Sequence, residues 1–417
     1  MTSVVERRAV GDRPALRRVL AETAEEFAAS RWGVRPLLST AQIPVPEHAV
    51  PWPASLGFDD LFSLEAADDL LAVYGVRTPF LRLARDGRVV PPARFTRSGG
   101  VGASVPDQVD ADAVAREYAA GASVVFQALH RNWPPLVEFT ARLTAEIGHP
   151  VQVNAYLTPP AAQGFSAHYD THDVFVLQVA GAKHWTVHPP VLALPWRDEP
   201  WEGRREDVAA RAAQPAYLDT RLVPGDSLYL PRGWLHSARA GQEPTLHLTV
   251  GVHPLTRRDL LDAAVERARQ DPCLRVPLPL GLEPDDGRSL GGDLRVVADV
   301  LHGLAPDQDV VGEALARRRR RDTRPEPLRP VAQAAAVAAL APTSRVRLRA
   351  HLVRRDRGAH VELHLPDGVS AVRADDPAVA RLLRGEPVTV ADLPGEPGHV
   401  LALVRRLLAE AVLVPAD

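Results

Sequence analysis

The hydrophobic residues in the first third of the chain recur mostly every three or four positions, which is the spacing of an amphipathic helix. Between the helical segments, a proline-rich connector runs over residues 36–53, and alternating residues on either side of Asp86-Gly87 predict a β-hairpin. We therefore expect a helical N-terminal segment with one hairpin. The predicted helices cover residues 13–31, 59–74 and 110–147, the last broken at Pro134-Pro135.

From residue 151 the hydrophobic period changes to two, which is the period of a β-strand. In VQVNAYL, the side chains of Gln152, Asn154 and Tyr156 share one face of the strand, and the apolar side chains share the other. Short strands separated by glycine and proline turns are typical of a sandwich or barrel rather than a parallel sheet. Further strands are expected at 174–181, 183–188, 227–231 and 245–251.

After residue 255 helical spacing returns. Residues 257–270 and 290–321 predict two helices, and we expect their apolar stripes to be buried against a second copy of the chain, as a homodimer. The last part of the chain predicts a small helix-and-strand module of winged-helix type, with an alternating pair around Arg357-Gly358 and helices at 331–340 and 399–411. Three domains are thus expected, over residues 1–255, 256–325 and 326–417.

Composition places the chain among soluble globular proteins. Of its 417 residues, 46% are hydrophobic and 24% are charged, which is typical of a protein with a substantial core and excludes disorder of the whole chain. No apolar run approaches the ~20 residues of a membrane helix. The N-terminus shows no secretory signal, so we expect a cytoplasmic protein. The single cysteine, Cys273, excludes an internal disulfide and a thiolate metal site.

The charge pattern does not favour nucleic acid. The net charge is −3, which gives no overall attraction for a polyanion. The basic run from Arg317 to Arg321 is interpreted as the solvated end of a helix. Acidic residues are interspersed through the C-terminal module, so we expect no direct nucleic-acid binding.

The strongest chemical signal is His168-Tyr169-Asp170. In an extended strand, residues i and i+2 point to the same face, so an imidazole and a carboxylate converge there. His236, in GDSLYLPRGWLHSA, comes just after a later strand and a Pro-Arg-Gly turn and can supply a third ligand. Two histidines and one carboxylate form the facial triad of non-haem Fe(II) oxygenases, which leaves positions open for a cosubstrate and O₂.

Lys183 is the single lysine among 49 lysines and arginines, and it opens the second strand after the His-x-Asp motif. An enzyme that uses 2-oxoglutarate needs a cation for the distal carboxylate of that acid, and lysine can serve as a point charge. Asn154 and Tyr156 lie on one face of the preceding strand. His247 shares a strand face with Thr249 and is expected to point into the barrel. His172 and His184 are interpreted as residues that pack or face the substrate.

The segments VQVNAYLTPP, HYDTHDVFVLQVAGAKHWTVHPP and GDSLYLPRGWLHSA resemble the JmjC-domain ribosomal oxygenases. The resemblance implies an α+β fold: a double-stranded β-helix (jelly-roll, cupin) core, a helical N-terminal segment, a helical dimerisation region and a C-terminal winged helix. It also implies hydroxylation of a histidine or arginine of a ribosomal protein, with 2-oxoglutarate and O₂ as cosubstrates. The implied site residues are His168, Asp170 and His236 for Fe(II), Lys183 for the distal carboxylate, and Asn154 and Tyr156 for the pocket wall.

Two positions depart from the family pattern. Many relatives carry a serine where this chain has Gly251, and we expect Thr249 or a water molecule to replace that hydroxyl. An acidic residue often follows the His-x-Asp motif directly, where this chain has Thr171 and then His172. The second position lies near the mouth of the site, so it concerns the choice of substrate more than iron binding.

Other functions are compatible with the same residues. The same oxygenase chemistry on a small molecule or peptide natural product is one alternative. Another is a non-enzymatic cupin regulator that uses the winged helix on DNA, and the acidic residues of that module argue against it. A metal isomerase on a cupin barrel is a further alternative, although such sites usually use more histidines than this motif supplies.

Overall fold

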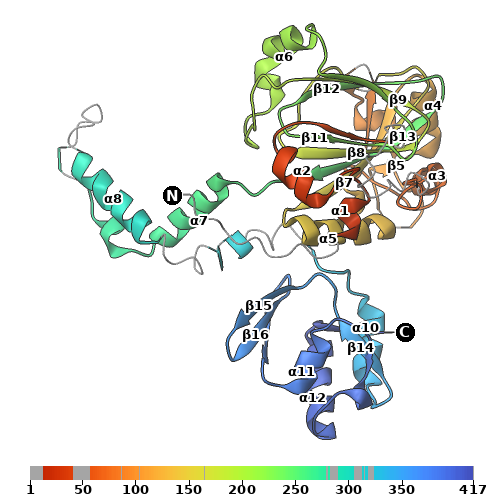
Figure 1. Cartoon of the computed structure of the whole chain (residues 1–417). Helices are drawn as coiled ribbons and strands as arrows, with labels where there is room; N and C mark the ends of the chain where they lie inside the picture. The colour runs from red at the N-terminus through yellow and green to blue at the C-terminus, as the bar shows by residue number, and fades with distance from the viewer. Residues whose placement is uncertain are drawn as a thin grey trace. The chain divides into compact units, whose positions relative to one another are not determined.

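The computed structural model describes residues 13–40, 57–85, 87–102, 104–163, 165–278, 280–281, 290–304, 312–313, 315–317 and 324–416. The chain divides into two compact units, Met1–Pro254 and Leu255–Asp417 (Figure 1). Most of the predicted proline-rich connector, and residues 318–321 of the basic run, lie outside the described residues. In the part of the chain that is described, no helix is both long and apolar enough to cross a membrane.

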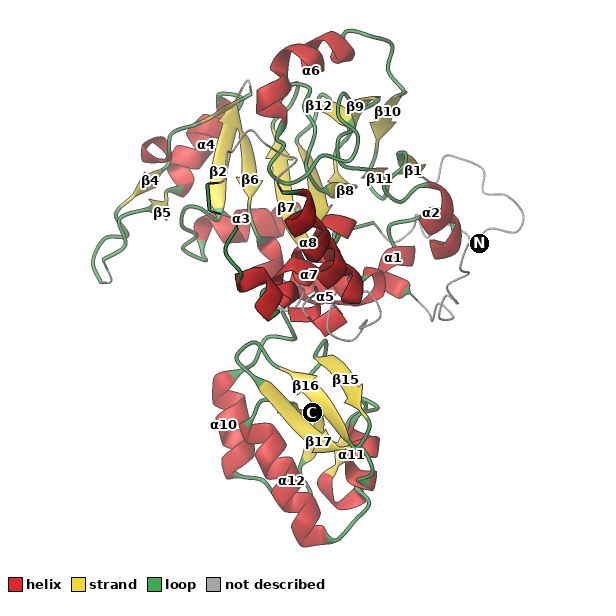
Figure 2. Ribbon diagram, turned by 90° about the vertical axis from the view of Figure 1, so that its left-hand side faces the viewer, coloured by secondary structure: helices red, strands yellow, loops and turns green. Residues whose placement is uncertain are grey.

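An eight-stranded antiparallel sheet forms the centre of the first unit (Figure 2). β13 lies between β7 and β8, so the order of the predicted strands in the sheet differs from their order in the chain. The strands follow the order β1 (Leu37–Ser39), β11 (Ser227–Leu230), β8 (Asp173–Ala180), β13 (Thr245–Val252), β7 (Val151–Thr158), β6 (Ser123–Phe126), β2 (Leu81–Arg85) and β3 (Arg88–Val89).

A second, three-stranded sheet packs on the first and completes a two-sheet barrel. It consists of β10 (Leu218–Leu222), β9 (Lys183–His188) and β12 (Leu235–Ala240). One buried cluster joins Val176 of β8, Trp185 of β9 and Leu222 of β10, which shows that the two sheets meet face to face. Burial of these side chains stabilises the pairing of the sheets, at roughly 25 cal/mol per Å² of apolar surface.

The two faces of β7 have different surroundings, as the alternation of its residues predicts. Val151, Val153 and Ala155 are buried in the same core cluster as residues of the helices that cover the outer face of the sheet. The intervening residues Gln152, Asn154 and Tyr156 are half-buried. The outer helices include α1 (Pro14–Arg17), α2 (Ala24–Ser30) and α5 (Pro134–Ile147); α3 (Leu64–Ala72), α4 (Ala111–Ala119) and α6 (Arg205–Ala212) complete the unit.

Several predicted helices are wrong in extent, among them the helix expected over 290–321, which ends at Gly303, and the helix expected over 59–74, which begins at Leu64. The segment 13–31 forms two short helices instead of one, because the Thr23 side chain accepts a hydrogen bond from Glu26 N and starts α2 with a capping box. The segment 110–147 contains the buried strand β6, whose backbone pairs with β2 and β7. Pro134 begins α5, because the first turn of a helix does not need the N–H that proline lacks.

The second unit contains helices α7 (Arg257–Ala268) and α8 (Gly291–Gly303) and a C-terminal module with its own buried cluster. The predicted hairpin around Arg357-Gly358 and the predicted last helix are both present. The module comprises α10 (Pro330–Ala338), α11 (Pro377–Leu382), α12 (Pro397–Ala409), the sheet β18 (Val388–Thr389), β14 (Arg345–Leu348), β19 (Leu413–Pro415), and the sheet β15 (Val353–Arg357), β16 (His360–His364), β17 (Val369–Arg373).

Candidate metal centre

The structure brings His168, Asp170 and His236 together. Each offers one ligand atom, and these atoms all lie within 4.8 Å of one another. His168 and Asp170 lie in the loop that leads into β8, and His236 is the second residue of β12. The site therefore joins the large sheet to the small one.

The Pro-Arg-Gly turn before β12 also holds Asp170. The backbone N–H of Gly233 donates to the carbonyl oxygen of Asp170 over 3.0 Å. Gly233 has φ of 87°, a conformation that L-residues rarely adopt, and a Cβ atom there would lie 2.4 Å from the carbonyl oxygen of Leu192. Glycine is required at this position for both reasons.

Backbone carbonyls set the tautomers of both histidines. Nδ1 of His168 lies 2.8 Å from the carbonyl oxygen of Ser166, and Nδ1 of His236 lies 3.2 Å from that of Trp234. A carbonyl oxygen can only accept, so both Nδ1 atoms carry the hydrogen, and both Nε2 atoms keep a free lone pair. Metal-binding histidines are commonly oriented by such hydrogen bonds.

The charges in the site suit a divalent metal ion. Burial alone would raise the pKa of Asp170, but His172 and His236 beside it hold that pKa below its usual value. Burial lowers the pKa of His236 to about 4. At neutral pH the site thus presents a carboxylate and a neutral imidazole, and this oxygen and nitrogen donor set fits Fe(II).

The ammonium group of Lys183 is buried, and its hydrogen-bond partners among the described residues are neutral groups. Its side chain is 3% exposed, and Nζ donates to Thr158 Oγ1 over 2.9 Å and to His247 Nδ1 over 3.4 Å. Among the described residues, no carboxylate forms an ion pair with this lysine. Burial lowers the pKa of Lys183 to about 7. A buried ammonium without a counter-ion is unfavourable, so an anionic ligand would complete the pocket.

His247 points into the barrel, as its strand face predicts. Its ring stacks on Tyr156 with centroids 4.9 Å apart and meets the edge of Trp185 at 5.5 Å. Burial holds the pKa of His247 well below its usual value, and the charge of Lys183 lowers it further. His247 is therefore a neutral acceptor for the lysine.

Asn154 and Thr249 face each other across the pairing of β7 and β13. The backbone N–H of Ala128 donates to Asn154 Oδ1 over 3.0 Å, which fixes the amide so that its NH₂ group is the part left for a ligand. His184, by contrast, is exposed and pairs with Asp219 at 2.6 Å, so it takes no part in the pocket.

Arg82 is a site residue that the sequence did not indicate. It lies on β2, its guanidinium stands 5.7 Å from the centre of the Phe165 ring, and its Nε is buried without a hydrogen-bond partner among the described residues. Its charge also contributes to lowering the pKa of Asp170. No motif surrounds it, and only the strand order brings β2 to this side of the barrel.

Comparison with known proteins finds a domain family whose model includes this site. The model of the JmjC domain matches residues 133–260. Ribosomal oxygenase 2 of Mus musculus is 34% identical over 196 residues, which cover 44% of this chain and 41% of the mouse protein. A bifunctional lysine-specific demethylase and histidyl-hydroxylase NO66 of Drosophila pseudoobscura pseudoobscura is 38% identical over 104 residues, or 25% of this chain and 10% of that protein. The matches thus span less than half of either relative.

The fold is also found in solved structures. The crystal structure of Escherichia coli ribosomal oxygenase YcfD superposes with a TM-score of 0.53 at 18% identity, over 94% of this chain and 98% of that chain. A structure of the same protein in complex with cobalt and 2-oxoglutarate gives a TM-score of 0.51. At this identity the likeness shows the cupin-type fold. The matches in sequence show that residues 133–260 form a JmjC domain similar to that of the ribosomal oxygenases.

Proposed function

We propose that this protein is an Fe(II)- and 2-oxoglutarate-dependent dioxygenase that hydroxylates a side chain of another protein. His168, Asp170 and His236 would hold the iron. The observation that carries the proposal is the orientation of the two histidines, whose Nε2 lone pairs are left free beside an ionised carboxylate. The chemistry that iron supplies in such a site is the oxidation of 2-oxoglutarate by O₂ to succinate and CO₂, coupled to insertion of the second oxygen atom into a substrate C–H bond.

The pocket residues bind and orient 2-oxoglutarate in this proposal. Lys183 pairs with the distal carboxylate, which supplies the negative charge that the buried ammonium lacks. Thr158 and His247 hold Nζ in place. Asn154 offers its NH₂ group, and Thr249, its cross-strand neighbour, contributes a hydroxyl to the same wall.

Tyr156 adds a neutral hydroxyl to the pocket wall. Burial raises the pKa of Tyr156, and the neighbouring charge of Asp170 raises it further, so the phenol keeps its proton. It can therefore donate a hydrogen bond to a bound oxygen atom. Stacking against His247 fixes its ring.

The proposed substrate is a histidine or arginine of a ribosomal protein. This part of the proposal is supported by the names of the relatives, a ribosomal oxygenase 2 and a histidyl-hydroxylase NO66. A small molecule or peptide natural product is the alternative substrate.

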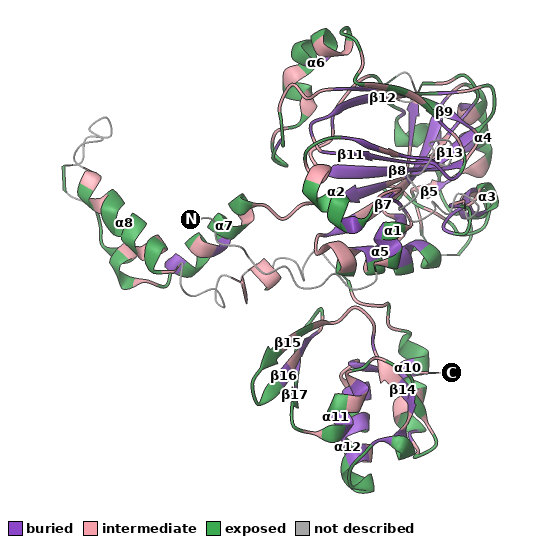
Figure 3. Ribbon diagram, in the orientation of Figure 1, coloured by how far each residue is buried: buried purple, intermediate pink, exposed green. Residues whose placement is uncertain are grey.

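We further propose three functional parts, residues 1–255 for catalysis, 256–325 for dimerisation, and 326–417 as a winged-helix module that packs against protein rather than nucleic acid. Helices α7 and α8 pack on each other, and much of their length is exposed (Figure 3). Large apolar side chains are among the exposed residues. A second copy of the chain is the proposed partner for this surface. Its residues are Leu260, Leu261, Val265, Leu294, Val296 and Val297.

An anaerobic titration tests the proposed chemistry. Purified protein receives Fe(II) and then 2-oxoglutarate, and the weak visible charge-transfer band of the complex is recorded. We expect the band to form, and to be lost in Lys183→Ala at low 2-oxoglutarate. Bound iron without the band would refute the proposed activity.

The substrate is tested in a deletion strain of the host. Mass spectrometry of its ribosomal proteins should show a residue that lacks the added oxygen atom found in the parent strain. If the titration succeeds and no ribosomal protein differs between the strains, the small-molecule substrate is favoured.

A further inference from the structure

The side chain of His172 occupies space that glycine leaves free at position 251. A Cβ atom on Gly251 would lie 2.9 Å from Nε2 and 3.0 Å from Cδ2 of His172, closer than such atoms normally approach. Gly251 lies within β13 and does not have a positive φ, so its backbone conformation does not require glycine. Space for the imidazole is the reason for glycine here.

One nitrogen of this imidazole is held by the sheet. Gln152 is the cross-strand partner of Gly251 on β7, and its Nε2 lies 3.0 Å from His172 Nε2. An amide nitrogen only donates, so His172 Nε2 accepts, and in the neutral ring Nδ1 carries the hydrogen. His253 closes one side of the ring, with centroids 5.0 Å apart. The orientation of the imidazole is therefore set by three neighbours.

The other nitrogen, Nδ1, has no hydrogen-bond partner among the described residues. His172 Nδ1 is buried and forms no hydrogen bond within the described part of the chain. Leaving a buried N–H donor unpaired is unfavourable, and most such groups in proteins find an acceptor. His172 stands two residues after Asp170, in the loop that carries two of the three proposed metal ligands. A molecule bound at the metal centre can supply an acceptor atom for the hydrogen bond that this N–H group lacks.

We infer that His172 is a specificity-determining residue, which donates through Nδ1 to an acceptor atom on the substrate side chain, and that Gly251 is glycine so that the imidazole can occupy this position. The inference rests on the proposed oxygenase function and names the chemistry of its substrate. The target side chain carries a neutral acceptor, such as an amide oxygen or an imidazole nitrogen.

The surroundings of His172 disfavour a cationic target. An arginine side chain has donors only, so it cannot accept from Nδ1. The positive charge of Arg82 also acts on Asp170 at this site, and it would repel a second cation bound there. Of the two target residues considered above, this pocket therefore accepts histidine and rejects arginine.

The steric part is tested without any substrate. Gly251→Ser should lower the melting temperature of the metal-free protein, because the new Cβ collides with the His172 ring. In a His172→Ala background the same substitution should cause a smaller further change, since only the contact with Gln152 Cγ at 3.1 Å then remains. Such non-additivity is expected of residues in contact. Equal effects of Gly251→Ser in both backgrounds would overturn the packing argument.

The specificity part is tested on ribosomal proteins isolated from the deletion strain and incubated with the iron-loaded enzyme. The wild-type enzyme should oxidise a residue of a ribosomal protein whose side chain carries a neutral hydrogen-bond acceptor. His172→Ala should raise the KM for that protein by about tenfold, the loss expected for one hydrogen bond, while the KM for 2-oxoglutarate changes less than about twofold. His184→Ala, an exposed histidine paired with Asp219, is the matched control and should keep the wild-type KM.

Three results would overturn the specificity role: oxidation of an arginine by the wild type, an unchanged KM in His172→Ala, or no oxidised ribosomal protein although the Fe(II)–2-oxoglutarate band forms. Failure of the proposed function is recognised separately, because the wild-type band would then be absent.

Discussion

The main chains of His168 and His236 are hydrogen-bonded to each other in both directions. The N–H of His168 donates to the carbonyl oxygen of His236 over 3.1 Å, and the N–H of His236 donates to that of His168 over 2.8 Å. Two proposed ligands from distant parts of the chain are therefore held together by backbone atoms. This pairing uses main-chain atoms alone and no side-chain ligand atom.

This relationship predicts that Asp170→Ala loses metal without unfolding. We expect the affinity for Co(II), a stand-in for Fe(II), to fall by more than about 100-fold, since even outer-shell substitutions cost about 10–100-fold. The melting temperature of the metal-free protein should remain close to that of the wild type. Titration followed by the visible absorption of Co(II) measures the affinity. Asp219→Ala removes an exposed carboxylate outside the site and should bind Co(II) normally.

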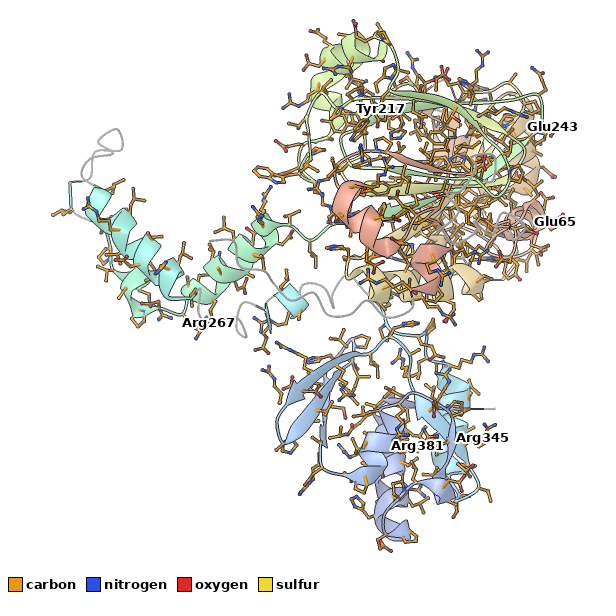
Figure 4. The ribbon with its side chains drawn as sticks, in the orientation of Figure 1. Glu65, Tyr217, Glu243, Arg267, Arg345 and Arg381 are labelled. Atoms are coloured by element: carbon orange, nitrogen blue, oxygen red, sulfur yellow. The ribbon has the colours of Figure 1, made fainter. Side chains whose placement is uncertain are left out.

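Tyr229 stabilises the segments that carry the ligands. Its hydroxyl donates to buried Asp173 Oδ2 over 2.5 Å and accepts from Gly33 N over 2.9 Å, while Arg232 N donates to Asp173 Oδ1 over 3.1 Å. Tyr229→Phe leaves buried polar groups unpaired, so we expect a loss of about 1–3 kcal/mol in the free energy of unfolding near neutral pH. Urea denaturation measures it. Tyr217→Phe, at an exposed tyrosine (Figure 4), should change stability little.

The same substitution has a predictable pH dependence. Burial raises the pKa of Asp173 above its ordinary value of 3.8, and the Tyr229 hydroxyl opposes this shift. Tyr229→Phe therefore raises the folded-state pKa further. The loss of stability should be small at acid pH, where Asp173 is protonated in both states, and should grow as pH rises through the folded-state pKa. A loss that shrinks with rising pH would contradict this account.

The exposed apolar surface of α7 and α8 predicts a dimer, and a single substitution that introduces a charge into this surface should disrupt it. Leu261 is 54% exposed and lies on the proposed interface. Leu261→Glu would bury an unpaired carboxylate, so we expect the dimer to weaken by more than about 100-fold. Light scattering coupled to gel filtration reports the mass. Arg267→Glu, on the same helix (Figure 4), is the control. A wild-type protein that is monomeric at high concentration would rule out the dimer.

The sequence predicted where the strands of the barrel lie in the chain better than it predicted which strands and side chains contact one another. The alternation through Asn154 and Tyr156 identified the polar face of β7, because the period of a strand is a local property. Lys183 was predicted as a site residue because it is the single lysine and opens the second strand after the His-x-Asp motif. The contact of His172 with Gly251 and the position of Arg82 depend on which strands pair and in what register, and register is set by packing and turns across the whole sheet.

The errors in the helical segment have local causes. Val124 and Val125 belong to a short, fully buried strand, and a continuous apolar run of this length cannot be distinguished from part of a helix by its period. Thr23 ends the expected first helix by capping a second one. Side chains that bond to nearby backbone compete with helical periodicity in this way.

The buried ammonium of Lys183 predicts how 2-oxoglutarate binding depends on pH. The pKa of Lys183 is about 7 in the ligand-free protein because of burial. A bound carboxylate favours the charged form, so above about pH 7 binding must take up a proton, and the affinity should fall by up to about tenfold per pH unit. Calorimetry on the Co(II)-loaded protein measures both affinity and proton uptake. Lys183→Arg stays charged and should show a flatter profile. An identical decline in that variant would show that another group titrates.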